Sequence, residues 1–377
     1  MDALQFVESM LTKAGVEING KNPWDPRMKD PADWARKVLR GGSKAFGNLY
    51  VLGYEQGGWD CDNSEQFITK VLDADLRKYF EPKFGMLWLL MRSKLLNLPL
   101  RNPWRVARAH YDRDPEVFDL VLGEIGTYSC AYFEHSDDLK EAQQAKNDLI
   151  CRKINLKAGD RVLEVGCGRG SFMVHAAKYG ARCVGLSVSV GQTTWAKEQH
   201  EHLGLPIEFY LTPWQQFVCD EPFDHVVSIG AFEHFGRGNY KQFFRWMRSV
   251  VKEDNFSLIH TIVTENRTGK DPWLNQEIFP EAELPRVSHV YEAARGSFKI
   301  EELHTFGYYY ALTLRKWLGN LRLHRGYIVE KYGIRLYRTW EHYLCSGVAN
   351  FETRRVDLGQ FLLTPRGVRG DVYHSIR

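Results

Sequence analysis

The fold of this chain is decided by the stretch Arg161-Val162-Leu163-Glu164-Val165-Gly166-Cys167-Gly168-Arg169-Gly170-Ser171. An apolar, β-branched run leads into three glycines, and a helical pattern of apolar residues begins after the last of them. Glycine suits such a turn because it adopts positive φ and lets a ligand lie against the backbone. The sequence therefore predicts a strand, a tight turn and a helix, with a ligand at the carboxyl end of the strand.

A turn of this kind fits NAD, FAD or S-adenosylmethionine, and two details discriminate between them. The spacing Gly-x-Gly-x-Gly is one residue shorter than the dinucleotide-binding Gly-x-Gly-x-x-Gly. Glu164 stands directly before the turn, where it would repel a pyrophosphate and attract a sulfonium or an ammonium. Opposite charges about 4 Å apart gain about 4 kcal/mol at an effective dielectric constant of about 20. A cationic cofactor is therefore favoured, although Glu164 also fits a solvated carboxylate at a strand end.

Helical and strand patterns alternate regularly from about residue 138 onward. They predict helix 138–153, strand 161–165, helix 171–179, strand 182–186, helix 190–202, strands 206–210 and 223–229, helix 239–251, strand 255–262, a helical block at 308–348 and a strand at 355–363. The alternation predicts an α/β fold, with a parallel, Rossmann-like sheet covered by helices on both faces. Helical patterns at 3–14 and 63–98 predict a smaller, mainly helical domain before it.

Length and composition set the domain organisation and exclude several function classes. A chain of 377 residues is expected to form two domains. We place an N-terminal domain at 1–98, a proline-containing linker at 99–113 and a catalytic domain at 114–377. The net charge of +3 gives no sign of a nucleic-acid partner. The odd number of cysteines, seven, without paired metal-type spacing predicts reduced thiols in a cytoplasmic protein with no metal. Neither a signal peptide nor a membrane span is expected.

Several separate motifs carry a resemblance to a known family. They are Tyr128–Phe133, Leu139–Lys146, Glu164–Gly170, Gly185–Gln192, Gly230–Gly236, His260–Ile262, Ile278–Pro280 and Tyr310. In these motifs the chain resembles the cyclopropane-fatty-acyl-phospholipid synthases and mycolic acid cyclopropane synthases, which are class I methyltransferases using S-adenosylmethionine. The resemblance implies transfer of a methylene group to the cis double bond of an unsaturated phospholipid acyl chain. The alternatives are a lipid C-methyltransferase that leaves a methyl branch, a small-molecule N- or O-methyltransferase and an inactive lipid-binding protein.

The resemblance also implies a set of cofactor-binding residues. They are Tyr128 and Ser129 at the methionine portion, Glu164, Gly166 and Gly168 at the turn, Ser187 and Gln192 at the ribose, and Trp214 and Gln215 at the adenine. Nucleotide-binding folds usually end the second strand with an acid for the ribose, and this chain has Ser187-Val188-Ser189 there. Hydroxyls and Gln192 would have to substitute. Without the resemblance, Trp214 fits a core residue better than a cofactor wall.

The implied chemistry needs a site lined by aromatic rings and shielded from water, with a well-placed base. In the family this base is thought to be a bound bicarbonate. The resemblance places it on the backbone amides of Cys130 and Ile262 and on the side chains of Glu233, His260 and Tyr310. From the residues alone, His260 fits a satisfied polar residue at a strand end. Cys130 fits a small buried residue, and Glu233 fits a carboxylate that favours a helix dipole.

Residues 76–108 contain eight basic residues and one acidic residue among many apolar ones. This pattern is typical of an interfacial helix on anionic lipid, with Trp88, Arg92 and Lys94 at the membrane. It equally fits a core helix or a dimer contact. Since the family's first domain is thought to present phospholipid, we expect peripheral association with the inner face of the cytoplasmic membrane, and a homodimer.

Overall fold

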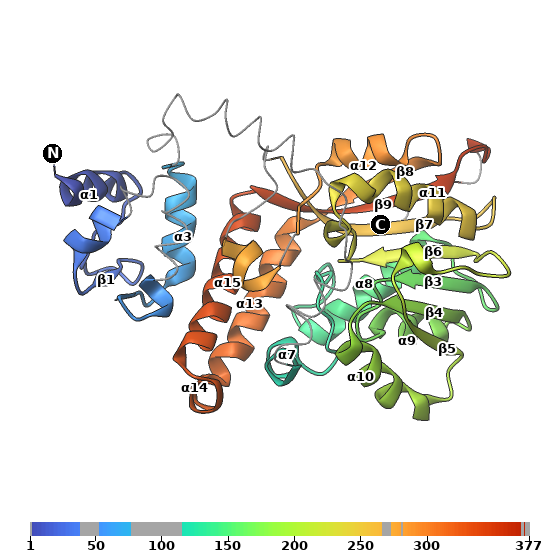
Figure 1. Ribbon diagram of the computed structural model, residues 1–377, viewed down its shortest axis with the longest axis horizontal. Helices are drawn as coiled ribbons and strands as arrows, with labels where there is room; N and C mark the ends of the chain where they lie inside the picture. The colour runs from blue at the N-terminus through green and yellow to red at the C-terminus, as the bar shows by residue number, and fades with distance from the viewer. Residues whose placement is uncertain are drawn as a thin grey trace. The chain divides into compact units, whose positions relative to one another are not determined.

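The computed structural model describes residues 2–37, 53–76, 115–265, 273–279, 282–370 and 373 (Figure 1). The predicted linker at 99–113 and the predicted membrane residues Trp88, Arg92 and Lys94 lie outside these ranges. Within the described ranges, the structure has no helix that is both long and apolar enough to cross a bilayer.

The chain divides into two compact units. The first comprises Met1–Asn97, Asp271–Ile278 and Leu314–Arg355, and the second comprises Leu98–Lys270, Phe279–Thr313 and Val356–Arg377. Residues 314–355 thus group with the N-terminal part of the chain, although the sequence assigned them to the domain at 114–377. The functional boundaries at 98 and 113 stay a prediction.

The first unit is mainly helical. Its elements are α1 (Ala3–Lys13), β1 (Arg27–Met28), β2 (Trp59–Asp60), α3 (Ser64–Asp73), the short helix η6 (Leu274–Ile278), α14 (Arg325–Tyr332) and α15 (Ile334–Glu352). Polar contacts tie its sequence-distant parts together: the Arg315 guanidinium lies 2.7 Å from the Glu65 carboxylate, and Tyr54 Oη donates to Glu341 Oε2 at 2.5 Å. These contacts explain why residues 314–355 belong to this unit.

A seven-stranded sheet forms the centre of the second unit. Its strand order is β5 (Ile207–Leu211), β4 (Arg182–Ser187), β3 (Arg161–Val165), β6 (His225–Ile229), β7 (Ser257–Thr264), β9 (Val356–Pro365) and β8 (Phe298–Thr305). The pairs from β5 to β7 are parallel, and β9 runs antiparallel to both of its neighbours. The chain begins at β3, moves to one edge and returns to β6, so β3 and β6 flank the switch point at which such sheets bind ligands.

Helices cover both faces of this sheet, as the sequence predicts. One face is covered by α8 (Leu139–Lys153), α9 (Ser171–Lys178) and α10 (Val190–His200), and the other by α11 (Tyr240–Val250) and α12 (Val287–Ala294). Two further helices are α7 (Pro115–Leu122), which precedes α8 in the chain, and α13 (Gly307–Leu323), which follows β8. Alternate strand residues serve the two cores: Val162 packs with α8 and α9, and Leu163 packs with α11. Two predictions were incomplete, because β8 was missed and β9 is antiparallel.

Capping residues set where two of the helices that border the site begin. Asp138 accepts a hydrogen bond from the Glu141 amide at 2.9 Å at the start of α8. Ser189 Oγ accepts from the Gln192 amide at 3.1 Å at the start of α10. These bonds satisfy amide donors that the first turn of a helix leaves unpaired, so the sequence fixes both helix starts locally.

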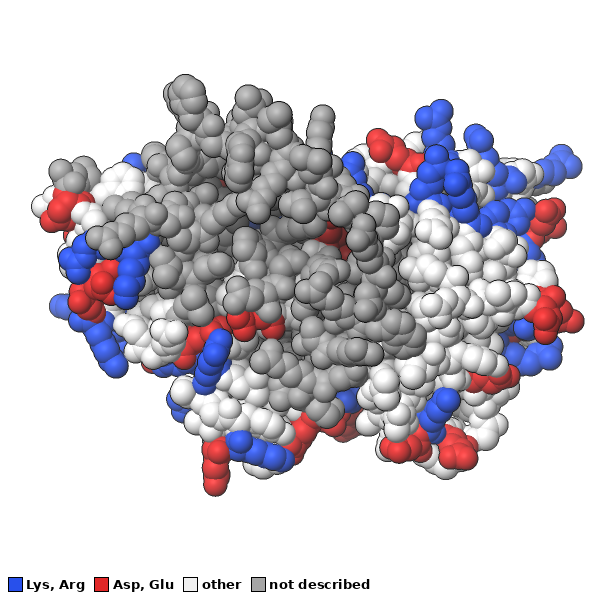
Figure 2. Space-filling view, in the orientation of Figure 1, with Lys and Arg blue, Asp and Glu red and all other residues white. Residues whose placement is uncertain are grey.

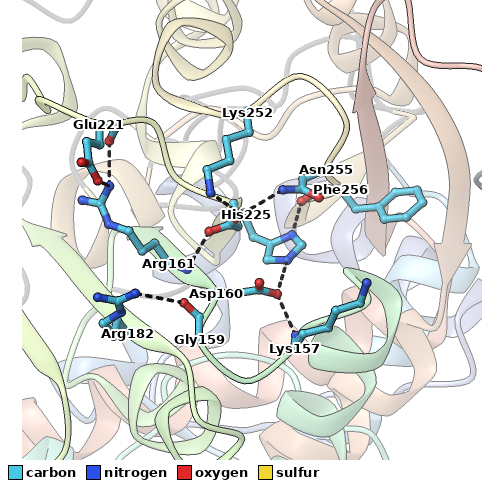
Figure 3. Close-up of polar contacts among 11 residues, drawn as sticks. Lys157, Gly159, Asp160, Arg161, Arg182, Glu221, His225, Lys252, Asn255 and Phe256 are labelled. Atoms are coloured by element: carbon cyan, nitrogen blue, oxygen red, sulfur yellow. Dashed lines mark hydrogen bonds and ion pairs between the residues drawn. The ribbon is translucent and has the colours of Figure 1, made fainter.

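A polar network joins the amino ends of β3, β6 and β7, opposite the glycine turn (Figure 3). The buried His225 ring contacts the Phe256 carbonyl at 2.8 Å and Asp160 Oδ2 at 3.2 Å. Asp224 accepts from the Arg161 amide at 2.9 Å and from Lys252 Nζ at 2.6 Å. The network cross-links one end of the sheet by hydrogen bonds and ion pairs.

We expect Asp224→Asn to lower the free energy of unfolding by about 1–2 kcal/mol at pH 7, because it weakens two charge-assisted hydrogen bonds. Burial acts to raise the pKa of Asp224, but its bonds to Arg161 and Lys252 hold that pKa below its ordinary value. A lowered folded-state pKa stabilises the fold above pH about 4, and this contribution is lost as the pH falls through the folded-state pKa. Urea unfolding should therefore show a larger difference from wild type at pH 7 than at pH 3. The exposed Asp220→Asn should show no difference at either pH.

The described surface carries both signs of charge, and basic side chains gather at the upper right of Figure 2. Figure 1 draws α11 and α12 in that part of the second unit. Helix α11 contains exposed Lys241 and Arg245 and no acidic residue. Charge reversal at Lys241 and Arg245 can therefore serve as the control for charge reversal in residues 76–108 when membrane binding is tested.

Candidate active site

The glycine turn between β3 and α9 has the backbone that the sequence predicts. Gly166, Gly168 and Gly170 all have positive φ, at 80°, 54° and 80°. A Cβ atom on Gly166 would lie 2.3 Å from the Ala231 Cβ, so no side chain fits there. At Gly168 a Cβ atom would meet no heavy atom within 4 Å. Glycine is therefore required at 166 by close packing and at 168 by conformation alone.

The nine predicted cofactor-binding residues all line one cavity at the carboxyl ends of β3, β4 and β6. They are Tyr128, Ser129, Glu164, Gly166, Gly168, Ser187, Gln192, Trp214 and Gln215. Residues separated by more than 80 positions thus come together at the switch point of the sheet. The cavity has both apolar and polar walls, and Phe118, Lys146 and His234 also line it.

Glu164 is buried at the end of β3, with 4% of its surface exposed. Its Oε2 atom has no hydrogen-bond partner among the residues that the structure describes. Burial raises the pKa of this carboxyl group, and the positive charge of Lys146 acts in the opposite direction. A buried carboxylate oxygen on a cavity wall is a ready acceptor for a cationic ligand.

At the end of β4, hydroxyl groups replace the acid that many nucleotide-binding folds have. Ser187 Oγ accepts a hydrogen bond from the Ser189 amide at 3.1 Å, and Ser189 caps α10. The Ser187 hydroxyl keeps its own proton to donate, and the half-buried Gln192 lies one helical turn further on. The residues at this end can therefore bind a hydroxylated group without a carboxylate.

The position of Trp214 agrees with both interpretations that the sequence allowed, a core residue and a wall of the cofactor site. Its ring packs against Phe243 and Trp246, with centroids 5.3 and 5.5 Å away, and belongs to the core beside α11. It also lines the cavity, next to the exposed Gln215. The core therefore fixes the ring that forms this part of the wall.

The five predicted catalytic residues lie in the second unit, outside the set that lines the cavity. Two of them come into contact: the buried Glu233 carboxylate accepts hydrogen bonds from the Ile262 amide and, at 2.6 Å, from Thr261 Oγ1. Burial raises the pKa of Glu233, and these bonds lower it. Glu233 is not among the residues that line the cavity, whereas the next two residues, His234 and Phe235, do line it.

His260 lies on β7 opposite Gln360 of β9 and is almost completely buried, with 1% exposed. Its Nδ1 lies 3.2 Å from Gln360 Nε2, which is an amide donor. In that arrangement Nε2 carries the ring proton, and Nε2 has no hydrogen-bond partner among the described residues. Burial lowers the pKa of His260 well below its ordinary value, so the ring is neutral.

Cys130 is fully buried, and burial raises the pKa of its thiol well above the ordinary value. A thiol of this kind is a poor nucleophile, which supports the interpretation of Cys130 as a small buried residue. The next residue, Ala131, donates its amide to Thr313 Oγ1 on α13 at 3.0 Å. Tyr310 is buried on the same helix, one turn earlier.

Lys146 is the site residue whose importance the sequence analysis missed. It lies on α8 with 1% exposed, and its charge acts on the pKa of Glu164, Cys130 and His260. The available signal was its position, because Lys146 falls on the buried side of α8 with Ala142 and Leu149. A charged residue on the apolar side of a helix has a partner or a function.

Comparison with known proteins gives a consistent set of similarities. The family model described as mycolic acid cyclopropane synthetase matches residues 99–361. The cyclopropane-fatty-acyl-phospholipid synthase of Escherichia coli K12 is 34% identical over 367 residues, which cover 97% of this chain and 94% of that protein.

Solved structures of similar proteins cover a smaller part of the chain. The cyclopropane synthase MmaA2 from Mycobacterium tuberculosis is 31% identical, with a TM-score of 0.65, over 71% of this chain and 99% of that one. The mycolic acid cyclopropane synthase CmaA1, complexed with SAH and CTAB, is 34% identical, with a TM-score of 0.65, over 70% and 99%.

Proposed function

Because this chain belongs to the mycolic acid cyclopropane synthetase family, we propose that it forms cyclopropane rings in unsaturated phospholipid acyl chains. The methylene group comes from S-adenosylmethionine, and S-adenosylhomocysteine is the second product. The choice of a phospholipid substrate depends on how much of the chain each relative matches. Similarity to the phospholipid synthase extends over 97% of this chain, whereas the mycolic acid synthase of Mycobacterium leprae matches 70% of it. The N-terminal part that only the former shares is the part expected to handle phospholipid.

The cavity fits the proposed methyl donor. S-adenosylmethionine would supply a methyl group on a sulfonium, which is electrophilic enough to react with an isolated alkene. Glu164 lines the cavity, and its Oε2 has no hydrogen-bond partner in the described part of the chain, so its carboxylate would attract the positive charges of this cofactor. Ser187 and Gln192 would hold the ribose, and Trp214 would pack against the adenine. Tyr128, whose ring contacts Phe118 edge to face at 5.3 Å, would lie beside the reacting carbon.

The reaction moves three electron pairs, those of the alkene π bond, the carbon–sulfur bond and one carbon–hydrogen bond of the methyl group, and it releases one proton. The alkene π electrons form a bond to the methyl carbon, the carbon–sulfur bond breaks, and its electrons stay on sulfur. The resulting carbocation loses a proton from the transferred methyl group as the ring closes. Aromatic side chains such as Phe235 and Phe118 exclude water, which would otherwise capture the cation.

A bound bicarbonate would supply the base for this proton. The unpartnered Nε2–H of His260 is a buried donor that suits an anion, and the Glu233 carboxylate would accept the bicarbonate hydroxyl and so orient it. The amides of Cys130 and Ile262 and the hydroxyl of Tyr310 would complete the site. Since Glu233 itself accepts the Ile262 amide in this structure, the anion would share or take over that bond.

Labelled S-adenosylmethionine and vesicles of a defined unsaturated phospholipid test the proposal. We expect label to enter the acyl chains, with mass spectrometry showing a ring at the former double bond. A methyl branch would identify the enzyme as a lipid C-methyltransferase, the alternative outcome. Absence of label in the lipid would contradict both.

Removal of bicarbonate should lower the activity roughly tenfold or more, because general-base assistance is lost. The assay uses carbon-dioxide-free buffer under argon, and bicarbonate is then added back. Activity should return with bicarbonate and should not return with the same concentration of chloride. Full activity in depleted buffer would show that a protein group is the base.

We also propose that residues 76–108 bring the enzyme to the cytoplasmic membrane. Arg92→Glu with Lys94→Glu should weaken binding to anionic vesicles by about 2 kcal/mol, or about thirtyfold, since each basic residue near the surface contributes about 1 kcal/mol. Sedimentation with vesicles measures this change. Lys241→Glu with Arg245→Glu reverses the same charge on α11 and should leave binding nearly unchanged.

Equal loss of binding in both double variants would indicate a general charge effect. Unchanged binding in the Arg92 and Lys94 variant would assign its segment to the core or to a dimer contact. The expected homodimer is tested in the same preparations by light scattering.

A further inference from the structure

Lys146 is a buried cation with an unusual lack of partners. Lys146 lines the cavity, and its Nζ lies 3.3 Å from Ser129 Oγ. Within the described ranges of the chain, no carboxylate lies within ion-pair distance of it, and Ser129 is its one hydrogen-bond acceptor. Lys153, about two turns further along α8, differs in this respect. Lys153 is equally buried and pairs with the Glu302 carboxylate at 2.7 Å.

Burying an ammonium with a single neutral acceptor is unfavourable, because the charge loses its water. Burial accordingly lowers the pKa of Lys146, while the more distant charge of Glu164 acts to raise it. A second anion in the cavity would complete the surroundings of this ammonium. The structure therefore indicates an anionic group of the ligand near Nζ.

The cavity wall presents charges of both signs. Glu164 contributes an unpartnered carboxylate oxygen, and Lys146 contributes ammonium protons. An α-amino acid carries the complementary pair, an ammonium and a carboxylate on one carbon. The methionine portion of S-adenosylmethionine is such a zwitterion.

Neighbouring groups hold Lys146 and Ser129 in place. Gln143, one turn earlier on α8, donates from Nε2 to the Ser129 carbonyl at 2.8 Å. Residues 143 and 146 lie on one side of the helix, so the two side chains together fix the segment that contains Ser129. Lys146 and the Ser129 hydroxyl thus form a preorganised pair of donors.

We propose that Lys146 binds the α-carboxylate of the methionine portion of S-adenosylmethionine, together with the Ser129 hydroxyl. This assignment rests on the proposed function, since it requires that cofactor in the cavity. Lys146 is then a binding residue, and its main effect is on affinity for ligands that carry the carboxylate.

Calorimetry on the full chain tests the assignment with two ligands. S-adenosylhomocysteine has the carboxylate, and S-adenosyl-3-thiopropylamine is the same compound without it. Wild type should bind the first about tenfold more tightly or better, because only the first offers an anion to the ammonium. Lys146→Met should bind both with affinities within about twofold of each other. Lys140→Met, an exposed change on the same helix, should retain the wild-type ratio.

Equal weakening of both ligands by Lys146→Met would overturn the proposal and assign Lys146 a structural role. Lys146→Gln, whose amide can still contact Ser129, serves if the Met variant does not fold, and it too should lose the discrimination. A wild-type protein that binds the two ligands equally would overturn the assignment without any variant. A wild-type protein that binds neither would overturn the proposed cofactor, and the role of Lys146 with it.

Discussion

Glu233→Gln should lower turnover about 100-fold or more, while affinity for S-adenosylhomocysteine stays within about threefold of wild type. The carboxylate lies outside the set that lines the cavity, so we expect cofactor affinity to change little in this variant. It accepts hydrogen bonds from Thr261 Oγ1 and the Ile262 amide. An amide side chain would turn an NH₂ group toward one of these donors, or toward the base, and would disorder the site.

Single-turnover assays with labelled S-adenosylmethionine and calorimetry with S-adenosylhomocysteine separate the two effects. Thr261→Val removes one hydrogen bond to Glu233 and keeps the shape of the side chain, so we expect a smaller loss of turnover. Near-normal turnover of the Gln variant would exclude the carboxylate from the chemistry. A parallel loss of cofactor affinity would instead indicate that the fold of the cavity had changed.

Gly166→Ala should lower the free energy of unfolding by about 2–5 kcal/mol and turnover by about 100-fold. The left-handed conformation accounts for about 1–2 kcal/mol of the first effect. The added Cβ would lie 2.3 Å from the Ala231 Cβ, and relief of this overlap adds a further 1–3 kcal/mol or so. The turn must move by about 1 Å, which displaces the cofactor from its reacting position.

Gly168→Ala is the matched control, because its backbone is also left-handed and its Cβ would meet open space. It should lose only about 1–2 kcal/mol of stability. Ala231→Gly in the Gly166→Ala background removes the overlapping atom and should restore the packing part of the loss. Urea unfolding of the single and double variants measures the coupling. Equal losses at 166 and 168 would show that packing against Ala231 is unimportant.

Local sequence patterns predict most of the sheet. Strand 161–165 was predicted at its observed bounds, and the capped helices α8 and α10 begin within one residue of the predicted positions. Strand β8 was missed because Glu301 and Glu302 interrupt its apolar pattern. Glu302 is buried in an ion pair with Lys153, a partner 149 positions away that no local window includes.

The candidate site also has features that the sequence predicts and features that depend on tertiary structure. Family motifs predicted nine of the residues that line the cavity, of which Glu164 and Ser187 lie at the ends of strands β3 and β4. The contact of Glu233 with Ile262 depends on how β6 and β7 align, and that alignment is a tertiary property. The role of Lys146 could not be predicted either, because it depends on the contact with Ser129 and on the cavity that Lys146 lines. Sequence reasoning therefore finds the residues more readily than their partners.

The position of β9 between β7 and β8 has a consequence for biosynthesis. In the described sheet β8 pairs with β9 alone, yet β8 ends at Thr305, some 50 residues before β9 begins at Val356. During that interval β8 is an edge with unsatisfied backbone groups, which invites aggregation. Its charged residues Lys299 and Glu301, the latter bonded to Thr364 of β9 in the finished sheet, would discourage wrong pairing in the nascent chain. Glu301, one of the two residues that obscure this strand in the sequence, would thus help to protect it while the protein is being made.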